Sequence, residues 1–255
     1  MTYSSIIAPK VAEGWVSHQT NLGVNSYDLD ELYSPDTAFQ RSKVLDAVSP
    51  KYSPNKTYIF DRSAYRNHGT ITGAVWTRLP SGLWVLTYDG NDYVNCGAGA
   101  SLNILGAMSV ITWFKLSAVG AMQGLVTKGY SAAAPYRTYQ FRVKDTNVLN
   151  LATGDGSNQV DGGTTLQVNT WYCGGFLKTD ATHATIYLNG VADSVSTVID
   201  APADKAADNL ILGAIYTGAA YGSYLNGLQI LTRVTNFALT NIMSYYQRER
   251  HLFGV

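Results

Sequence analysis

Residues 109–117 read Ser-Val-Ile-Thr-Trp-Phe-Lys-Leu-Ser, and this stretch decides the fold. In an extended strand, successive side chains point to opposite faces. The two faces then carry Val110, Thr112, Phe114 and Leu116 on one side and Ile111 and Trp113 on the other. Because both faces are largely apolar, we expect this strand at the centre of a sheet that is covered on both sides.

Three further stretches predict strands beside turn residues. Residues 82–88 (GLWVLTY) run into Asp-Gly-Asn-Asp, and residues 228–234 (LQILTRV) alternate in the same way. Residues 184–188 (ATIYL) lead into Asn189-Gly190, which favours a type I′ hairpin because both residues tolerate positive φ. Short strands with regular turns from about residue 57 predict an all-β sandwich or barrel.

The two ends of the chain predict helices. Ser34-Pro35-Asp36 resembles an N-cap followed by proline, so we expect a helix over residues 35–47. Residues 1–55 hold too few apolar residues for a core of their own and are assigned to an N-terminal arm, with the main domain at 56–255. The arm either packs along the domain or docks it onto a larger assembly. Thr240 is expected to cap a closing helix that reaches Arg250.

Charge and composition exclude several classes of protein. The chain has 255 residues with 18 Lys plus Arg and 18 Asp plus Glu, so it carries no global field that would attract nucleic acid. It holds no run of about 18 apolar residues, so no membrane span is expected. The first ten residues do not resemble a secretory signal, and we expect synthesis without that export route. Cys96 and Cys173 form either one bridge or two buried thiols.

Several short motifs occur in the same order as in a known protein family. They are, in chain order, Phe60-Asp61-Arg62-Ser63 with Asn67-His68-Gly69-Thr70, then Leu86-Thr87-Tyr88-Asp89-Gly90-Asn91-Asp92-Tyr93-Val94, Val110-Ile111-Thr112-Trp113-Phe114-Lys115, Ile186-Tyr187-Leu188-Asn189-Gly190 and Tyr224-Leu225-Asn226-Gly227. Over roughly residues 57–250 this order resembles the laminin-G-like (concanavalin A-like) jelly-roll domains of lectins, adhesins and phage virion proteins. The resemblance implies an all-β, two-sheet antiparallel jelly-roll sandwich, with an irregular, partly helical N-terminal arm and a short C-terminal helix.

Catalytic residues of the superfamily's enzymes are missing. Glucanases with this fold use two carboxylates, usually Glu, and the chain has no Glu between residues 32 and 248. Polysaccharide lyases of similar shape need clustered Arg, Gln, His and Tyr, but outside the two terminal segments the chain has only His68 and His183. Nucleophile-elbow, phosphate-loop and zinc motifs are also missing. We therefore predict that the protein is not an enzyme.

Two groups of residues are candidates for binding. The resemblance implies a structural calcium ion held by Asp61 and Asn67, whose oxygens suit Ca²⁺; the alternative is that both residues cap a turn. Exposed tyrosines in two small-residue loops are candidates for stacking on sugar faces, unless they pack on the edge of the sandwich. They are Tyr130, Tyr136, Tyr216 and Tyr221.

These observations favour a non-enzymatic virion structural protein, either a phage head-decoration protein or a tail-associated adhesin. The arm would bind other virion or assembly proteins, and the jelly roll would face outward for protein or glycan contact. The alternative is a carbohydrate-binding module or lectin domain of a secreted cellular protein, which places it outside the cell. A homo-oligomer is compatible with either role, although no apolar stripe in the sequence indicates where its interface would lie. No nucleic acid or membrane partner is expected.

Overall fold

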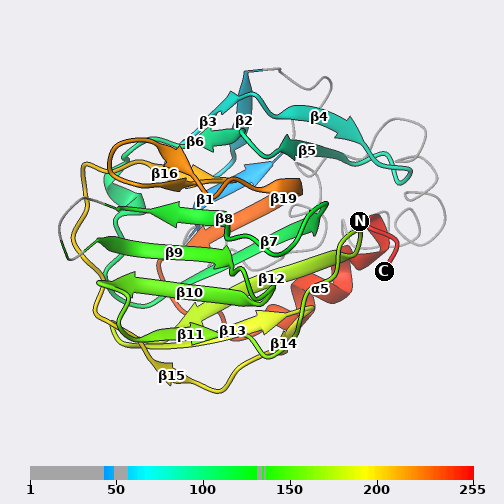
Figure 1. The fold of residues 1–255 in the computed structure, drawn as a ribbon. Coiled ribbons are helices and arrows are strands. Elements are labelled where there is room, and N and C mark those ends of the chain that lie inside the picture. Colours follow the sequence, from blue (N-terminus) through cyan, green and yellow to red (C-terminus); the bar gives the residue numbers. More distant parts are fainter. Residues whose placement is uncertain (1–42, 49–56, 131–133, 135) are drawn as a thin grey trace, which may run out of the picture.

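The structure is a computed structural model that describes residues 43–48, 57–130, 134 and 136–255. Its strands form two antiparallel layers that pack face to face (Figure 1). Sheet A contains β1 (Lys43–Val48), β4 (Val75–Arg78), β5 (Trp84–Asp89), β7 (Met108–Leu116), β12 (Trp171–Lys178), β13 (His183–Leu188), β14 (Val191–Ala192), β15 (Thr197–Val198) and β19 (Asn226–Thr235).

Sheet B contains β3 (Gly69–Thr72), β6 (Tyr93–Asn95), β8 (Gln123–Lys128), β9 (Arg137–Val143), β10 (Leu149–Gly154), β11 (Gln159–Asp161) and β16 (Leu210–Leu212). Strand β2 (Tyr58–Asp61) pairs with β1 on one side and β3 on the other, so it joins the two layers. A small separate hairpin is formed by β17 (Ile215–Tyr216) and β18 (Tyr221–Gly222). The helices among the described residues are η1 (Ala100–Leu102), α5 (Ile242–Glu249) and η2 (Arg250–Leu252).

Strand β7 is the central strand that the sequence predicts. It pairs with β19 and β12, and its side chains are buried on both faces apart from the partly exposed Lys115. Across the two sheets, Phe141 and Phe176 pack edge to face with ring centroids 5.5 Å apart. On the other side of sheet A, the Trp113 ring stacks on Phe253, at 4.0 Å between centroids. Sheet B therefore covers one face of sheet A and the C-terminal helices cover the other.

The predicted all-β sandwich is confirmed, and so is the turn at Asn189-Gly190. Their φ values are 51° and 81°, and the turn links β13 to β14. Both cysteines are buried and free, so the alternative of one bridge is wrong. In the described part of the chain, no helix is long and apolar enough to span a bilayer.

The predicted helix over residues 35–47 is wrong for residues 43–47, which belong to strand β1. All six side chains of β1 are buried, and its backbone bonds to β19 on one side and β2 on the other. Tertiary pairing of this kind overrides the weak local preference for helix. These six residues lie within the segment assigned to the arm and are part of the sandwich. Residues 35–42 lie outside the described residues.

The closing helix is present, but Thr240 does not cap it. The side chain of Asn241 accepts a hydrogen bond from the Ser244 backbone N–H at 3.2 Å, so α5 begins one residue later than predicted. Asparagine ranks above threonine at this position because its short amide oxygen reaches the free N–H groups of the first turn.

Candidate functional site

A pocket of about 220 Å³ lies where the β17–β18 hairpin meets β16. Tyr216 and Tyr221 face each other across this hairpin, with ring centroids 5.4 Å apart. Tyr221 also stacks on Tyr93 of β6, at 4.1 Å and an interplanar angle of 27°. The pocket is smaller than the roughly 300–1,000 Å³ of sites for drug-sized ligands. Its size and aromatic wall therefore suit one small ring. We call it the Tyr216 pocket.

The floor of the Tyr216 pocket is polar. Asp208 and Asn209 line it together with Ala207 and Ile211. The buried ammonium of Lys128 donates to the backbone carbonyl of Asp208. The Oδ2 atom of the Asp208 carboxylate is buried and has no hydrogen-bond partner. A buried oxygen without a partner costs free energy. Asp208 and Asn209 are the polar residues of the lining that a ligand hydroxyl group would contact.

Tyr130 and Tyr136 form a second aromatic pair beside β9. Their rings stack at 5.2 Å between centroids, and the guanidinium carbon of Arg137 lies 5.3 Å from the first ring and 5.6 Å from the second. Burial lowers the pKa of Arg137, while the two tyrosines and two nearby aspartates oppose this effect. We call these three residues the Arg137 cluster. Flat rings beside a guanidinium can contact both the face and the polar groups of a sugar.

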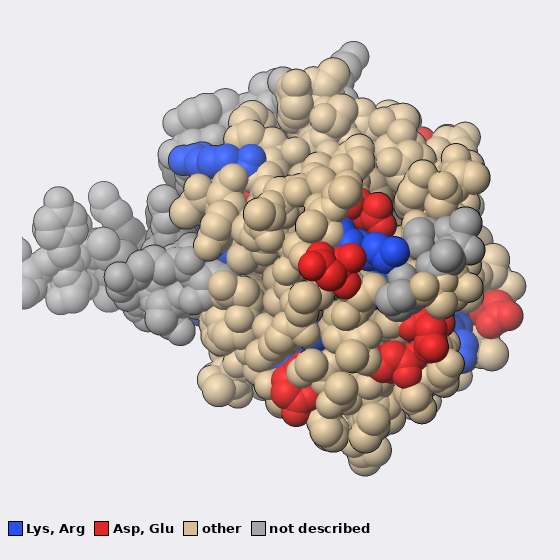
Figure 2. Space-filling view, turned by 90° about the vertical axis from the view of Figure 1, so that its left-hand side faces the viewer, with Lys and Arg blue, Asp and Glu red and all other residues tan. Residues whose placement is uncertain are grey.

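A network of amides and one further arginine extends from the Arg137 cluster over the outer side of sheet B. Gln140 Oε1 accepts from Arg137 Nε at 3.1 Å and from Arg142 Nη1 at 3.2 Å. Arg142 also donates to Asn150 Oδ1 at 2.7 Å and to Gln159 Oε1 at 3.0 Å. Figure 2 shows that charged side chains on the face at the left-hand side of Figure 1 form small mixed groups and that most of this face is uncharged.

The segment 203–209 contacts both aromatic sites. At one end, the backbone N–H of Ala203 donates to the Arg137 carbonyl at 2.8 Å. At the other end, Ala207, Asp208 and Asn209 line the Tyr216 pocket. The four predicted tyrosines are thus partly exposed and form two pairs, and no ring contact joins one pair to the other among the described residues.

Sequence reasoning missed several residues of these sites, namely Tyr93, Arg137, Asp208 and Asn209. Tyr93 belongs to a motif that suggested only a strand. Asp208 and Asn209 lie in a loop between β15 and β16 without any motif. Only the pairing of β16 with β6 and β8 brings this loop to the tyrosines.

Asp61 is fully occupied by donors of the chain. Its Oδ1 accepts from the backbone N–H groups of Asp46 and Ser63, both at 2.8 Å. Its Oδ2 accepts from the Ser63 hydroxyl at 2.7 Å and from the Asn67 backbone N–H at 2.6 Å. A carboxylate has about four acceptor positions, so none is left for a cation. Asn67 uses its amide N–H groups on the Val44 carbonyl and on the Ser101 hydroxyl.

These contacts do not fit the calcium ion that the family resemblance implies at Asp61 and Asn67. Asp61 matches the alternative, because it caps the turn through the Ser63 and Asn67 backbone N–H groups. The Asn67 side chain does not, because it bonds to Val44 and Ser101 outside the turn. In addition, the described residues hold no group of three or more His, Cys, Asp or Glu side chains that could bind a metal. The Asp61 carboxylate therefore links β1, β2 and the following loop by hydrogen bonds.

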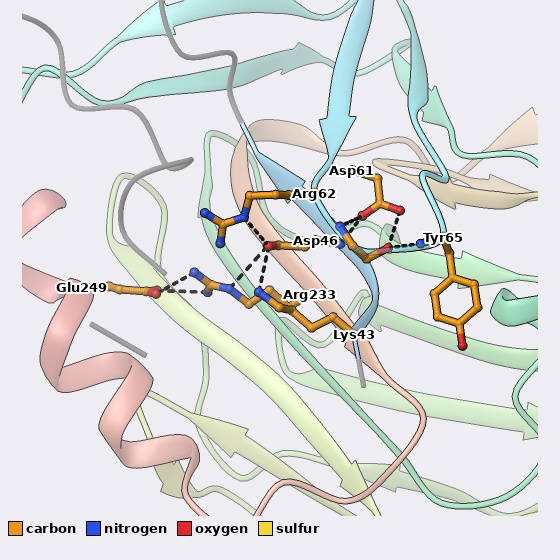
Figure 3. A network of polar contacts seen from close by, with 8 residues as sticks. Lys43, Asp46, Asp61, Arg62, Tyr65, Arg233 and Glu249 are labelled. Carbon is orange, nitrogen blue, oxygen red and sulfur yellow. Dashed lines mark hydrogen bonds and ion pairs between the residues drawn. The ribbon is translucent and has the colours of Figure 1, made fainter. Parts of the chain in front are cut away.

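A buried network of charges fixes the C-terminal helix to the sandwich (Figure 3). Asp46 of β1 accepts from Lys43 Nζ at 2.8 Å and Arg62 Nε at 3.1 Å, and its Oδ1 lies 3.7 Å from Arg233 Nε. Arg233 of β19 pairs with Glu249 of α5 at 2.7 Å. Each of these side chains is at least nine-tenths buried. Removal of one partner would leave the others charged and desolvated.

Glu249 is the one glutamate among the described residues, and it is not available for catalysis. Its Oε1 pairs with Arg233, its Oε2 accepts from the Trp113 indole N–H at 2.7 Å, and the residue is 3% exposed. The two-glutamate arrangement of retaining glucanases is therefore missing from the described part of the domain.

With the two layers and the aromatic sites in place, comparison with known proteins defines the family. Residues 88–241, more than half of the chain, match a laminin-G family model described as the concanavalin A-like lectin/glucanases superfamily. The chain belongs to this superfamily. A search of curated protein sequences gives no match.

Solved structures share the fold at low sequence identity. Domain 4 of AbnA, an extracellular arabinanase from Geobacillus stearothermophilus solved with arabinotriose, is 17% identical with a TM-score of 0.56; the match covers 72% of this chain and 89% of that one. A mutant of Trypanosoma rangeli sialidase with trans-sialidase activity is 12% identical with a TM-score of 0.59, over 84% and 34%. The binding domain of Paraclostridial Mosquitocidal Protein 1 is 11% identical with a TM-score of 0.53, over 84% and 53%. The chain spans about a third of the sialidase's length.

Proposed function

We propose that this protein is a non-catalytic carbohydrate-binding domain and that the Tyr216 pocket is its primary sugar site. The observation that carries the proposal is the combination of two tyrosine rings with the polar residues Asp208 and Asn209 in the lining of one small pocket. A sugar ring has an apolar face for Tyr216 and Tyr221 and hydroxyl groups for Asp208. The arabinanase domain solved with arabinotriose has the same fold, which supports the choice of ligand class.

Two features of the structure support the proposal that the domain is not catalytic. Glu249 is sealed between Arg233 and Trp113. Asp208 lies beside the Lys128 ammonium without a second acid among the residues that line the pocket. Hydrolysis of a glycosidic bond needs an acid and a second carboxylate on opposite sides of that bond. The pocket therefore holds a sugar without cleaving it.

The setting in which the domain binds its glycan is a separate part of the proposal. A place on a virus particle, where the protein would act as a decoration protein or adhesin, remains our first choice, with a secreted cellular protein as the alternative. This part depends on the N-terminal segment, most of which lies outside the described residues. Mass spectrometry of purified particles would test it, since a virion protein must be found there with a defined neighbour.

A glycan array followed by calorimetric titration of the full chain tests sugar binding. We expect at least one neutral glycan to bind, and Asp208→Asn to weaken that binding by about 10- to 150-fold. This range corresponds to about 1.5–3 kcal/mol for a hydrogen bond to a charged group. Tyr216→Ala should also weaken binding, because it removes one aromatic wall.

Tyr65→Ala serves as the matched control. Tyr65 is 51% exposed, lies in the turn after β2 and is not among the residues that line the pocket. Its loss should leave glycan affinity unchanged. An array without any hit, or equal affinities for wild type, Asp208→Asn and Tyr216→Ala, would show that the pocket is not a sugar site.

A further inference from the structure

Two arginines on the outer side of sheet B, Arg137 and Arg142, lie close together and have no carboxylate partner in the part of the chain that the structure describes. Arg137 donates to the Gln140 amide oxygen and, at 2.7 Å, to the backbone carbonyl of Asp155. Arg142 is 6% exposed and donates only to the side-chain oxygens of Asn150, Gln140 and Gln159. Every acceptor in this set is neutral, and among the described residues neither guanidinium forms an ion pair.

The nearest acidic side chains are engaged elsewhere. Asp155 Oδ1 accepts from the Ser157 backbone N–H at 2.9 Å, and Asp200 accepts from the Asn158 side chain at 2.7 Å. Asp161 pairs with Lys144 at 2.9 Å. These carboxylates attract the arginines at longer range only. Burial together with the charge of Arg137 lowers the pKa of Arg142 to about 10, so Arg142 is still charged at neutral pH.

The two cations therefore form a site of concentrated positive charge. Partly buried cations are normally paired, because desolvation without a counter-charge costs free energy. The Nη2 atom of Arg137 donates to no described group, so it can reach a ligand. A guanidinium binds a planar carboxylate through parallel N–H donors. The rings of Tyr130 and Tyr136 beside it supply the flat apolar surface that a sugar ring needs.

We propose that the Arg137 cluster binds the carboxylate of an acidic sugar, either a uronic acid or a sialic acid. This inference rests on the proposed glycan-binding function and adds a ligand class to it. Arg137 contacts the carboxylate, Tyr130 and Tyr136 contact the ring, and Arg142 adds positive charge from below. Gln140 holds the two guanidinium groups in position by accepting from both.

Calorimetric titration of the full chain with matched probes tests the inference. One pair is trigalacturonic acid and the corresponding neutral galacto-oligosaccharide, and the other is 3′-sialyllactose and lactose. We expect one acid to bind at least tenfold more tightly than its neutral counterpart. Added sodium chloride should reduce this preference, because salt screens a partly exposed ion pair. The pair that shows the preference identifies which of the two acids is bound.

Arg137→Gln should reduce the preference to less than threefold, and Arg137→Lys should retain part of it because it keeps the charge. Lys144→Gln is the matched control. It removes one positive charge close to Arg142, but that charge is already paired with Asp161, so the preference should not change. Thermal melts of each variant establish that the fold is intact. If Arg137→Gln unfolds, the preference for the acidic sugar is compared between the wild type and Arg137→Lys instead.

Two outcomes overturn the inference. One is equal affinity for the acid and its neutral counterpart in both pairs, and the other is a preference that survives Arg137→Gln undiminished. Either result leaves the proposed function intact if a neutral glycan still binds in a manner that depends on Asp208. The absence of binding by every glycan, acidic or neutral, would instead contradict both proposals together.

Discussion

Glu249→Gln tests the buried charge network that joins the C-terminal helix to the sandwich. In the wild type, Glu249 accepts from two groups of Arg233, at 2.7 and 3.3 Å, and from the Trp113 indole N–H at 2.7 Å. Glutamine has nearly the same shape, but it carries no charge and offers only one oxygen. Its NH₂ group would face N–H donors of Arg233 or Trp113. Arg233, which is 1% exposed, would also lose its closer counter-charge and keep the more distant one, Asp46 at 3.7 Å.

The expected cost follows from this geometry. Removal of one partner of a buried ion pair typically costs about 3–5 kcal/mol. For a domain of this size, 1 kcal/mol lowers the melting temperature by about 2–4 °C. We therefore expect a decrease of roughly 6–20 °C in melting temperature and a clear fall in the urea midpoint.

Urea unfolding followed by tryptophan fluorescence is the assay. Lys144→Gln is the control, since the Lys144–Asp161 pair is partly exposed and pairs of that kind contribute about 0–1 kcal/mol. If Glu249→Gln lowers the free energy of unfolding by no more than Lys144→Gln does, the network does not hold the helix in place and our reading of it is wrong.

Three further predictions concern the turns and the C-terminus. Gly190→Ala should destabilise the protein by about 1–2 kcal/mol because of its positive φ, and by more because the new Cβ would lie 2.9 Å from Met243. The control in urea unfolding is Gly254→Ala, where φ is also positive but no atom lies within 4 Å of the new Cβ. An equal loss of stability in both variants would contradict the predicted clash with Met243. Asp61→Asn should cost roughly 2–3 kcal/mol, and EDTA should shift the melting temperature of neither form; an EDTA-sensitive wild type would revive the calcium prediction. Burial lowers the pKa of His251 below 6.5, so the unfolded chain binds more protons and the free energy of unfolding should rise between about pH 5 and 7. His251→Gln should weaken this rise. An unchanged pH profile of stability would show that His251 does not contribute.

The sequence predicted the sandwich well because its signals were local. Trp113 and its neighbours alternate between two apolar faces, and Asn189-Gly190 can hardly form anything except a tight reversal. Strand β1 was missed because its environment is not local. Lys43 and Asp46 look like exposed helix residues in sequence, and only the pairing with β19 and β2 explains their burial.

The candidate site was predictable in part. Composition and loop context singled out the four tyrosines, which the structure arranges in two pairs. The carboxylate of Asp208 and the arginines at 137 and 142 could not be recognised in this way. Their significance depends on which groups lie within hydrogen-bond distance, and those partners come from strands far apart in the chain. The family model confirms the fold but assigns no ligand.

The central claim is that this domain works by holding a sugar against the aromatic wall formed by Tyr216 and Tyr221 without reacting with it. The most direct measurement is a crystal structure of the full chain with the tightest-binding neutral glycan from the array. Our account predicts an intact sugar ring packed against both tyrosines, with a hydroxyl group that donates to the Asp208 carboxylate. A glycan bound elsewhere with the pocket filled by water, or a cleaved product in the pocket, would contradict it.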